Sequence, residues 1–478
     1  MNHIQGMSRD QVLLFPERLD DYIPAHHLVR VIDAYIDTLD FLGLGFTHAQ
    51  PHPTGRPSYH PGDLLKLYVY GYMHRVRSSR ELEKQSRRNI EVMWLINKLT
   101  PSFKTIADFR RDNGPALRRV FRHFTLFCRD NALITGERVV IDGSKFKAVN
   151  SKERNLNERK LKEKIKRIDQ RIEDYLKQLD EQDAEEEAEQ SSVDPSAIEE
   201  ALKRLKKNKQ TAQQQLAQLH DSDAKQISLT DADARAMRSG QGASLIGYNV
   251  QTVVDSRHKL LVSVDVSNEG NDRQQLYPMA KQAKELLALE EMHVVADSGY
   301  SNEKQVARCH KDGIIPALPK QRFNGNKKQG GYCKEQFHYD PDKDCYRCPQ
   351  GHELTYRSTS NHHGRQVKLY RTPACKHCAA RPKCTQNKRK GREIARGIDE
   401  DHLDAADQRF RCSPELKTIR KQTVEHPFGT LKRGWNQGYF LMKSIKKVKT
   451  EISLSALAYN LTRAINTLGV PKLLQAMA

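Results

Sequence analysis

Four apolar stretches with the character of β-strands constrain the fold of this chain more than any other feature. The first, "ERVVIDGSKFK", places three β-branched residues directly before Asp142 and Gly143, which is typical of a buried strand that ends in an acid. Further strands are predicted at 247–255, 259–267 and 292–300, and a stretch with helical spacing, "DRQQLYPMAKQAKELLAL", precedes the last. Strands that alternate with a helix predict a mixed α/β domain with a central sheet.

The first 135 residues are instead expected to form short helices. Apolar residues repeat there with the 3.6-residue period of a helix, as at Leu28, Val31, Ile32, Tyr35, Ile36 and Leu39. Ser78 and Glu81 have the spacing of a capping box at the start of another helix. Short helices rich in Arg occur in helix-turn-helix DNA readers and in ordinary solvated bundles, and this pattern fits both.

Two segments interrupt the predicted sheet. The first, residues 151–224, is highly charged, yet its isoleucines and leucines step by three and four, so we expect an antiparallel helical hairpin with a coiled-coil seam. Most of its Lys and Glu are expected on a solvated face. The second, residues 321–412, is rich in cysteine and is expected to form a ribbon.

The cysteine spacing in the second segment is that of a structural zinc site. Two CxxC pairs offer four thiolates to one tetrahedral ion, and they are Cys345 with Cys348 and Cys375 with Cys378. A closed four-thiolate site stabilises a fold without catalysing a reaction, because no coordination position stays open. Two alternatives remain: Cys384, His377 or His352 replaces one ligand, or the thiols are buried or redox-active instead.

The charge balance favours a polyanionic partner. The chain has 80 Lys and Arg against 60 Asp and Glu, a formal net charge of +20, and phosphates neutralised by such cations release counterions. A membrane is the rival partner, but no apolar run approaches the roughly 18 residues of a spanning helix. Nine cysteines, an odd number, without an export signal favour a reduced, intracellular protein over a disulfide framework.

Three acids stand in positions that solvation explains poorly. Asp142 and Asp297 each follow an apolar strand, and Glu425 lies near the start of an amphipathic stretch in a basic region. Carboxylates that converge at a sheet edge repel one another until divalent cations bind, and hard oxygen ligands suit Mg²⁺ or Mn²⁺. Two such ions roughly 3.5 to 4 Å apart are suited to phosphodiester cleavage. The alternative for each Asp is a turn former at a strand end.

The order of these acids, in "VVIDGSK", "VVADSGY" and "VEHPFGTLK", resembles the DDE transposases of bacterial insertion sequences, which have an RNase H-like core. The stretches "PAHHLVRVIDAYID", "GRPSYHPGDLLKLYVYGYMHRVRSSRELEKQSRRNIEVMWL" and "KTIADFRRDN" are similar to the helical N-terminal domain of these enzymes, and "GYNVQTVVD" is similar to their second core strand. The ribbon "CYRCPQGHEL…CKHCAARPKC" resembles the insertion-sequence group numbered eleven eighty-two. The resemblance covers nearly the whole chain.

This resemblance implies an RNase H-like mixed sheet with flanking helices, preceded by an all-α domain and interrupted by the helical hairpin and a zinc-ribbon-like insertion. The implied division is a helical DNA-binding domain at 1–135, core segments at 136–150 and 225–320, the hairpin at 151–224, the Cys-rich insertion at 321–412, and C-terminal helices with the catalytic Glu at 413–478.

The resemblance also implies a reaction. Asp142, Asp297 and Glu425 would bind two Mg²⁺ or Mn²⁺ ions, cleave strands at the ends of the element and join the freed 3′ hydroxyl to target DNA. The implied partners are terminal inverted repeats, target DNA and a second copy of the chain in a synaptic complex, in the bacterial cytoplasm. Two other functions remain open: a non-catalytic, domesticated DNA-binding relative, and a metal-dependent nuclease that does not join strands.

Further residues are expected around the acids. Lys432 matches the Lys of the family's signature after the Glu, and Arg420 and Arg433 are further candidates for DNA contact. The Arg of that signature falls on Lys421 and its Tyr on Thr418, so the upstream half departs from the family pattern.

Other acids are expected beside the triad without being ligands. They are Asp272, Asp231 and Asp233. Pro427 is expected to make the helix begin close to Glu425 or kink there, because proline lacks a backbone donor.

Overall fold

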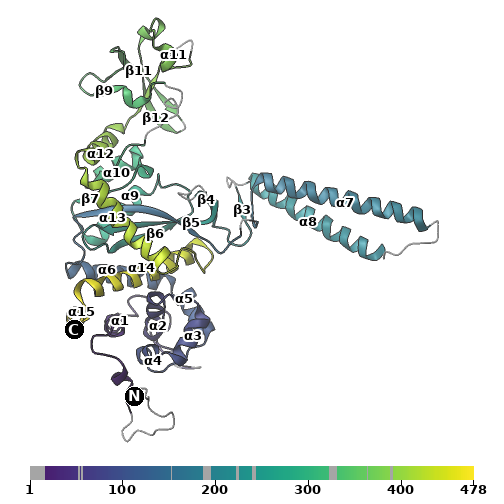
Figure 1. Cartoon of the computed structure of the whole chain (residues 1–478), viewed down its shortest axis with the longest axis vertical. Helices are drawn as coiled ribbons and strands as arrows, with labels where there is room; N and C mark the ends of the chain where they lie inside the picture. Colours follow the sequence, from purple (N-terminus) through teal and green to yellow (C-terminus); the bar gives the residue numbers. More distant parts are fainter. Residues whose placement is uncertain are drawn as a thin grey trace, which may run out of the picture.

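A computed structural model describes residues 17–51, 54, 57–151, 153–186, 195–221, 226–238, 244–321, 331–362, 364–387 and 391–478. Helices occupy one end of the molecule, a sheet the middle and a small ribbon the other end, while a long helical hairpin projects sideways from the sheet (Figure 1). The predicted mixed α/β class is confirmed. In the described ranges, no helix is long and apolar enough to cross a membrane.

The N-terminal end is helical. Its elements are η1 (Leu19–Tyr22), α1 (Leu28–Asp37), α2 (Pro61–Met73), α3 (Ser79–Arg88), α4 (Ile90–Leu95), α5 (Phe103–Asp112) and α6 (Gly114–Asp130). The apolar face predicted for α1 is buried, and Tyr35 donates a hydrogen bond to the backbone oxygen of Val120 in α6 at 3.1 Å. The predicted capping box is wrong: Ser78 precedes α3 but makes no capping bond, because Glu81 binds Gln85 at 3.0 Å instead.

The central sheet has antiparallel and parallel halves. Its strands are β1 (Arg138–Lys147), β4 (Arg235–Arg238), β5 (Ser244–Asp255), β6 (Leu261–Ser267), β7 (Met292–Val295) and β8 (Ile314–Ala317). They follow the order β4–β5–β1–β7–β8, and β6 also pairs with β5. Pairs β1–β5 and β5–β6 are antiparallel, whereas β1–β7 and β7–β8 are parallel. β1 is therefore the central strand where the halves meet. Helices α9 (Leu276–Leu287) and α10 (Glu303–Lys311) connect the later strands.

The first strand is longer than its sequence predicts. We expected it to end at Asp142, but it continues to Lys147 because Gly143 to Lys147 pair with Gln251 to Gly247 of β5. Asp142 therefore lies in mid-strand, directly across from Thr252.

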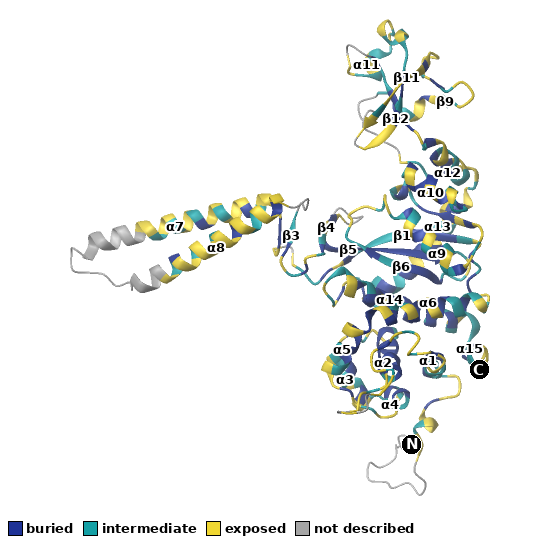
Figure 2. Cartoon of the chain, turned by 180° about the vertical axis from the view of Figure 1, so that it is seen from behind, coloured by how far each residue is buried: buried dark blue, intermediate teal, exposed yellow. Residues whose placement is uncertain are grey.

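The C-terminal helices close the fold. They are α12 (Glu400–Cys412), α13 (Glu415–Gly429), the π-helical turn η6 (Thr430–Gly434), α14 (Ile445–Leu468) and α15 (Val470–Met477). α14 is buried along most of its length between the N-terminal helices and the sheet (Figure 2). The side chain of Asn460 in α14 exchanges two 2.8 Å hydrogen bonds with the backbone of Leu261 in β6. α14 thus joins the helical end to the sheet.

The hairpin consists of α7 (Glu158–Glu186) and α8 (Pro195–Asp221), which run antiparallel, and residues 187–194 between them lie outside the described residues. At its base, strand β2 (Asn155–Leu156) pairs with β3 (Ile227–Ser228). Leu156, Leu161 and Leu219 form a small cluster there. Exposed residues cover most of the hairpin surface (Figure 2).

The ribbon has its own sheet and a small core. Its elements are η4 (Lys334–Gln336), β9 (His338–Asp340), β10 (Cys345–Arg347), β11 (Glu353–His362), β12 (Arg365–Arg371), η5 (Pro373–Lys376), α11 (Arg381–Cys384) and β13 (Ile394–Gly397). The sheet order is β13–β12–β11–β10–β9. Its buried cluster consists of Phe337, Tyr346, Leu354, Tyr370 and Ile394. So small a core supplies little stability of its own.

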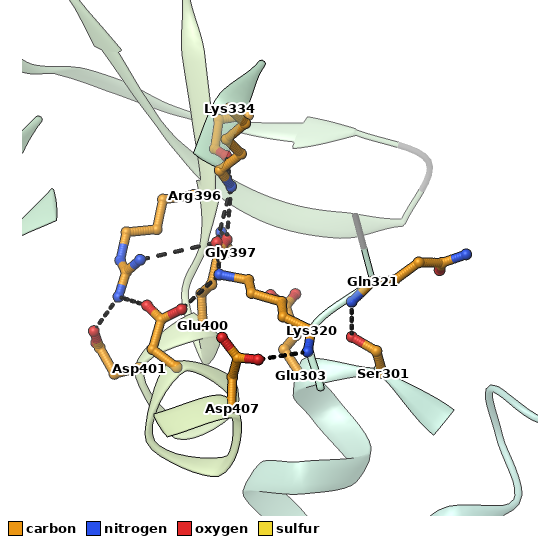
Figure 3. A network of polar contacts seen from close by, with 12 residues as sticks. Ser301, Glu303, Lys320, Gln321, Lys334, Arg396, Gly397, Glu400, Asp401 and Asp407 are labelled. Atoms are coloured by element: carbon orange, nitrogen blue, oxygen red, sulfur yellow. Dashed lines mark hydrogen bonds and ion pairs between the residues drawn. The ribbon is translucent and has the colours of Figure 1, made fainter. Parts of the chain in front are cut away.

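A buried carboxylate fastens the ribbon to the core (Figure 3). Glu400 is 1% exposed, and its Oε1 lies 2.6 Å from Nζ of Lys320, before the ribbon, and 2.8 Å from Nζ of Lys334, within it. Its Oε2 accepts a 2.8 Å hydrogen bond from the backbone of Gly397. Burial alone would raise the pKa of Glu400, but the charges of Lys334 and Lys320 lower it to about 2.

This junction predicts a pH-dependent stability. The folded-state pKa of Glu400 lies below the ordinary value of 4.5, so its contribution is complete above pH 4.5 and is lost as pH falls toward 2. The shift corresponds to about 3 kcal/mol. We expect Glu400→Gln to lower the free energy of unfolding by that order at pH 7. In urea titrations, the difference in free energy of unfolding between this variant and wild type should shrink below pH 4.5. A difference that does not change with pH would contradict this account.

Candidate active site

Asp142 and Asp297 come from neighbouring parallel strands. Each lies two residues beyond a cross-strand pair, Val140 of β1 with Val295 of β7. After β7 the chain turns into η2 (Ser298–Tyr300), and Oδ1 of Asp297 accepts a 2.7 Å hydrogen bond from the backbone of Gly299. The parallel register therefore brings Asp142, within β1, level with Asp297, which lies just beyond the end of β7.

The proximity of Asp297 affects the ionisation of Asp142. Burial and the negative charge of Asp297 raise the pKa of Asp142 to about 7. Arg420 of α13, whose Nη1 lies 3.4 Å from Oδ2 of Asp142, opposes this rise, as does the 2.8 Å hydrogen bond from the Gly143 backbone. A carboxyl group that resists ionisation beside another is typical of a site that gains from a bound cation.

A third acid, Asp272, lies beside this pair. Its Oδ1 accepts hydrogen bonds of 2.6 Å from the amides of Asn249 and Gln251, and Nζ of Lys145 is 3.5 Å away. The charge of Asp272 also contributes to the raised pKa of Asp142. With its Oδ1 held by two amides and a lysine, Asp272 fits the supporting position that the sequence predicts for it.

The two amides were missed in the sequence, although a signal was present. Asn249 and Gln251 alternate with apolar residues in "GYNVQTVVD", so they lie on one face of β5. Gln251 also accepts a hydrogen bond from Tyr300 at 2.5 Å. This face leaves no room beside Gly143, where an added Cβ would lie 2.4 Å from Nε2 of Gln251. Polar residues inside a buried strand were the clue to a functional site.

Glu425 stands apart from the two aspartates. It lies on α13, its side chain is 65% exposed, and it forms an ion pair with Lys421 at 4.0 Å. Among the described residues, no contact joins it to Asp142 or Asp297. Its neighbour Val424 is buried, so successive helical residues, about 100° apart, direct Glu425 away from the packed face.

The helix does not begin at Glu425. α13 starts at Glu415, contains Pro427 in its interior and continues to Gly429 before the π-helical turn η6. The expectation of a helix start at Glu425 is wrong. Because Pro427 has no N–H to donate to the backbone oxygen of Thr423, the regular hydrogen-bond pattern of α13 is interrupted there. The wider π-helical turn η6 begins within one helical turn of Pro427, at Thr430.

The basic candidates have different surroundings. Lys432, on η6, donates 2.6 Å hydrogen bonds to Oγ of Ser144 and the backbone oxygen of Lys145. Burial and the charge of Lys145 lower the pKa of Lys432 to about 8. Lys432 therefore fastens η6 to β1 beside Asp142. Arg433 is exposed, and its side chain forms no hydrogen bond or ion pair with another described residue.

The four predicted zinc ligands are not brought together. Cys345 lies in β10, where side chains alternate, and its neighbour Tyr346 is in the ribbon core, so Cys345 occupies the other side of the strand. A cavity of about 20 Å³ is instead lined by Cys348, Cys375, Cys378 and Cys384, together with His352. The charges of the other three thiols contribute to raising the pKa of Cys384, after burial.

The described residues contain no group of three or more His, Cys, Asp and Glu side chains arranged to hold a metal ion. This holds for the acids as well as for the thiols. Asp231 and Asp233 lie elsewhere: they accept 3.0 and 2.9 Å hydrogen bonds from the backbone of Ser444 and Ile445 at the start of α14. The expectation that they approach the acid site is wrong, because they cap this helix.

Two segments of the chain match known families. Residues 17–112 match the family described as "Transposase domain (DUF772)", and residues 347–465 match the "Transposase DDE domain". The second match contains Glu425 and most of the ribbon, whereas Asp142 and Asp297 lie between the two matches. A search of curated proteins found no match.

Among solved structures, the chain is similar to the "Cryo-EM structure of piggyBac transposase synaptic complex with hairpin DNA". The sequence identity is 10%, the alignment covers 94% of this chain and 81% of that chain, and the TM-score is 0.23. A similarity this low carries no weight for fold or function.

Proposed function

We propose that this chain, two segments of which match transposase families, is a DDE transposase of an insertion sequence that cleaves the ends of its own element and joins the freed 3′ hydroxyl to target DNA. The observation that carries the proposal is the pair of Asp142 and Asp297 on adjacent strands, with a pKa of about 7 for Asp142. The proposal includes a homodimer that pairs two element ends.

The sheet supports an RNase H-like core. Three antiparallel strands, β6, β5 and β1, adjoin two parallel strands, β7 and β8. Asp142 lies on the central strand and Asp297 directly beyond its parallel neighbour. The hairpin and the ribbon leave this arrangement intact, because they emerge after β1 and after β8.

Asp142 and Asp297 fit a divalent metal ion, since parallel pairing brings their carboxylates level on adjacent strands, and burial together with the charge of Asp297 disfavours ionisation of Asp142. Bound Mg²⁺ or Mn²⁺ would activate the attacking oxygen and stabilise the leaving one. Glu425 is the proposed third ligand, and its exposed carboxylate, weakly paired with Lys421, is free to reorient. Arg420 balances the charge of Asp142, and Lys432 fixes β1 against η6.

A strand-transfer assay tests this function. Purified protein, duplex DNA with the inverted repeats that flank its gene, a target plasmid and Mg²⁺ should yield nicked ends and joined products. EDTA should abolish both. Binding without nicking would favour the non-catalytic relative, and nicking without joining would favour a nuclease; either result would overturn the proposal.

We also propose one structural zinc ion in the ribbon, bound by thiols that line a single cavity and that would have to draw closer together than they lie in this structure. These are Cys348, Cys375, Cys378 and Cys384. Thiolates are the ligands that zinc prefers, and a metal would stabilise a sheet whose own buried cluster is small.

Metal analysis separates this set from the two CxxC pairs. We expect about one zinc per chain, retained in Cys345→Ser and lost in Cys384→Ser, because Cys345 lies on the far side of β10. Loss of zinc should also lower the melting temperature of the ribbon. If zinc were instead lost in Cys345→Ser and retained in Cys384→Ser, Cys345 would be a ligand. Folded protein without zinc would contradict the site altogether.

A further inference from the structure

A concave basic surface lies outside the acid site. Helices α6, α9 and α14 and strand β6 enclose a groove of about 570 Å³. Its charged lining consists of Arg118, Arg119, Arg122, Lys446, Lys449 and Asp265. Five cations therefore face one carboxylate.

Most of this positive charge lacks a protein counter-ion. Lys449 pairs with Asp265 at 2.7 Å, and Nε of Arg119 donates to the backbone oxygen of Leu44 at 2.8 Å. In the part of the chain that the structure describes, the side chains of Arg118, Arg122 and Lys446 form no hydrogen bond or ion pair.

The cations are crowded as well as unpaired. Arg118 and Arg122 are four residues apart on α6, so they share a helix face and repel each other, as do Lys446 and Lys449 on α14. Burial lowers the pKa of Arg118, and the charges of Arg122 and Arg119 lower it further, whereas Asp265 raises it. α6 and α14 are packed side by side, so an anion in the groove would relieve repulsion on both helices.

The groove is close to the acids within the sheet. Val264, which lines it, pairs with Thr252 of β5, and Thr252 pairs with Asp142. The backbones of Val264 and Asp142 are therefore two strand spacings apart, which is about 10 Å. Successive phosphates of one DNA strand rise by roughly 3.4 Å, so a few nucleotides span this separation.

We propose that this groove binds the phosphate backbone of duplex DNA, as a contact separate from the acid site. The inference rests on the proposed function for the identity of the partner. Phosphate contacts made by Arg and Lys are independent of sequence and set the position of a protein on DNA. Binding here would hold the duplex while its end lies at Asp142 and Asp297.

Salt-dependent DNA binding tests the groove. Arg122 and Lys446 are both exposed, so Arg122→Gln/Lys446→Gln should fold normally. With a 20-base-pair duplex of arbitrary sequence, we expect about a tenfold or larger loss of affinity at 0.1 M salt. The slope of log K against log salt should become shallower by up to roughly 1.8, or 0.9 per lost phosphate contact. The variant that keeps both charges, Arg122→Lys/Lys446→Arg, should bind like wild type.

A matched variant controls for the loss of net charge. Lys311→Gln/Lys472→Gln also removes two exposed cations, on α10 and α15, and should leave the slope unchanged. Equal slopes for groove and control variants would overturn the inference. The inference would also be overturned if the groove variant lost binding to anionic lipid vesicles and still bound DNA like wild type. Failure of the proposed function is distinct: wild-type protein itself would then neither cleave nor join DNA.

Discussion

Asp142→Asn and Asp297→Asn should each lower the rate of Mg²⁺-dependent strand cleavage by at least about 10³-fold. Loss of one metal-binding carboxylate removes several kcal/mol of transition-state stabilisation, and about 4 kcal/mol corresponds to this factor. Affinity for end DNA should change little, because the basic residues that we propose as its phosphate contacts lie elsewhere. Single-turnover cleavage and binding assays measure the two quantities separately.

Stability provides a second readout for Asp142. Its folded-state pKa of about 7 lies above the ordinary 3.8, so ionisation of this partly buried acid opposes folding as pH rises through that interval, and the penalty is complete at pH 8. Asn keeps the shape and carries no charge. We therefore expect Asp142→Asn to melt at pH 8 at the same temperature as wild type or at a higher one. Substitutions in active sites often stabilise a protein while they remove its activity.

The control for the predicted loss of cleavage is Asp174→Asn, which changes an exposed acid on the hairpin helix α7. It should cleave at the wild-type rate. If Asp142→Asn and Asp297→Asn cleaved equally well, neither aspartate would be part of the reaction. If Asp142→Asn lost activity and also melted early, its carboxylate would be structural.

The aspartate pair could be predicted because strand pattern fixes backbone position. "VVIDG" and "VVADSG" each have an acid two residues after a buried pair of valines, and parallel pairing of these valines brings the two acids level. The length of β1 could not be predicted, because pairing of Gly143 to Lys147 depends on β5, about a hundred residues later in the chain. Local pattern carries no information about that long-range pairing.

Side-chain direction was the harder part of the site. Glu425 was recognised from its context, but its distance from Asp142 depends on the rotation of α13, which the packing of Val424 and Pro427 decides. Cys345 shows the same limitation, since CxxC spacing does not reveal that its first residue lies in a strand. Spacing predicts which residues are near in sequence, and tertiary packing decides which of them face one another.

A second glutamate near the C-terminus differs from Glu425 in its burial and its contacts. Glu451 of α14 is fully buried, and its carboxylate accepts 3.0 Å hydrogen bonds from the backbone of Leu441 and Met442. Nη1 of Arg77, between α2 and α3, lies 3.2 Å from its Oε1. Burial raises the pKa of Glu451, and the charges of Arg110 and Arg77 oppose this rise. The N-terminal helices are thus fastened to α14 through one carboxylate.

Glu451→Ala should therefore lower the free energy of unfolding by about 3–5 kcal/mol, because Arg77 would become a buried charge without its partner. That is a large part of the roughly 5–15 kcal/mol that stabilises a typical domain. Urea denaturation measures the loss. Glu425→Ala is the matched control: its pair with Lys421 is exposed at 4.0 Å, so its stability should change by less than about 1 kcal/mol while cleavage is lost. Equal stability losses in the two variants would contradict the division of one glutamate for folding and one for chemistry.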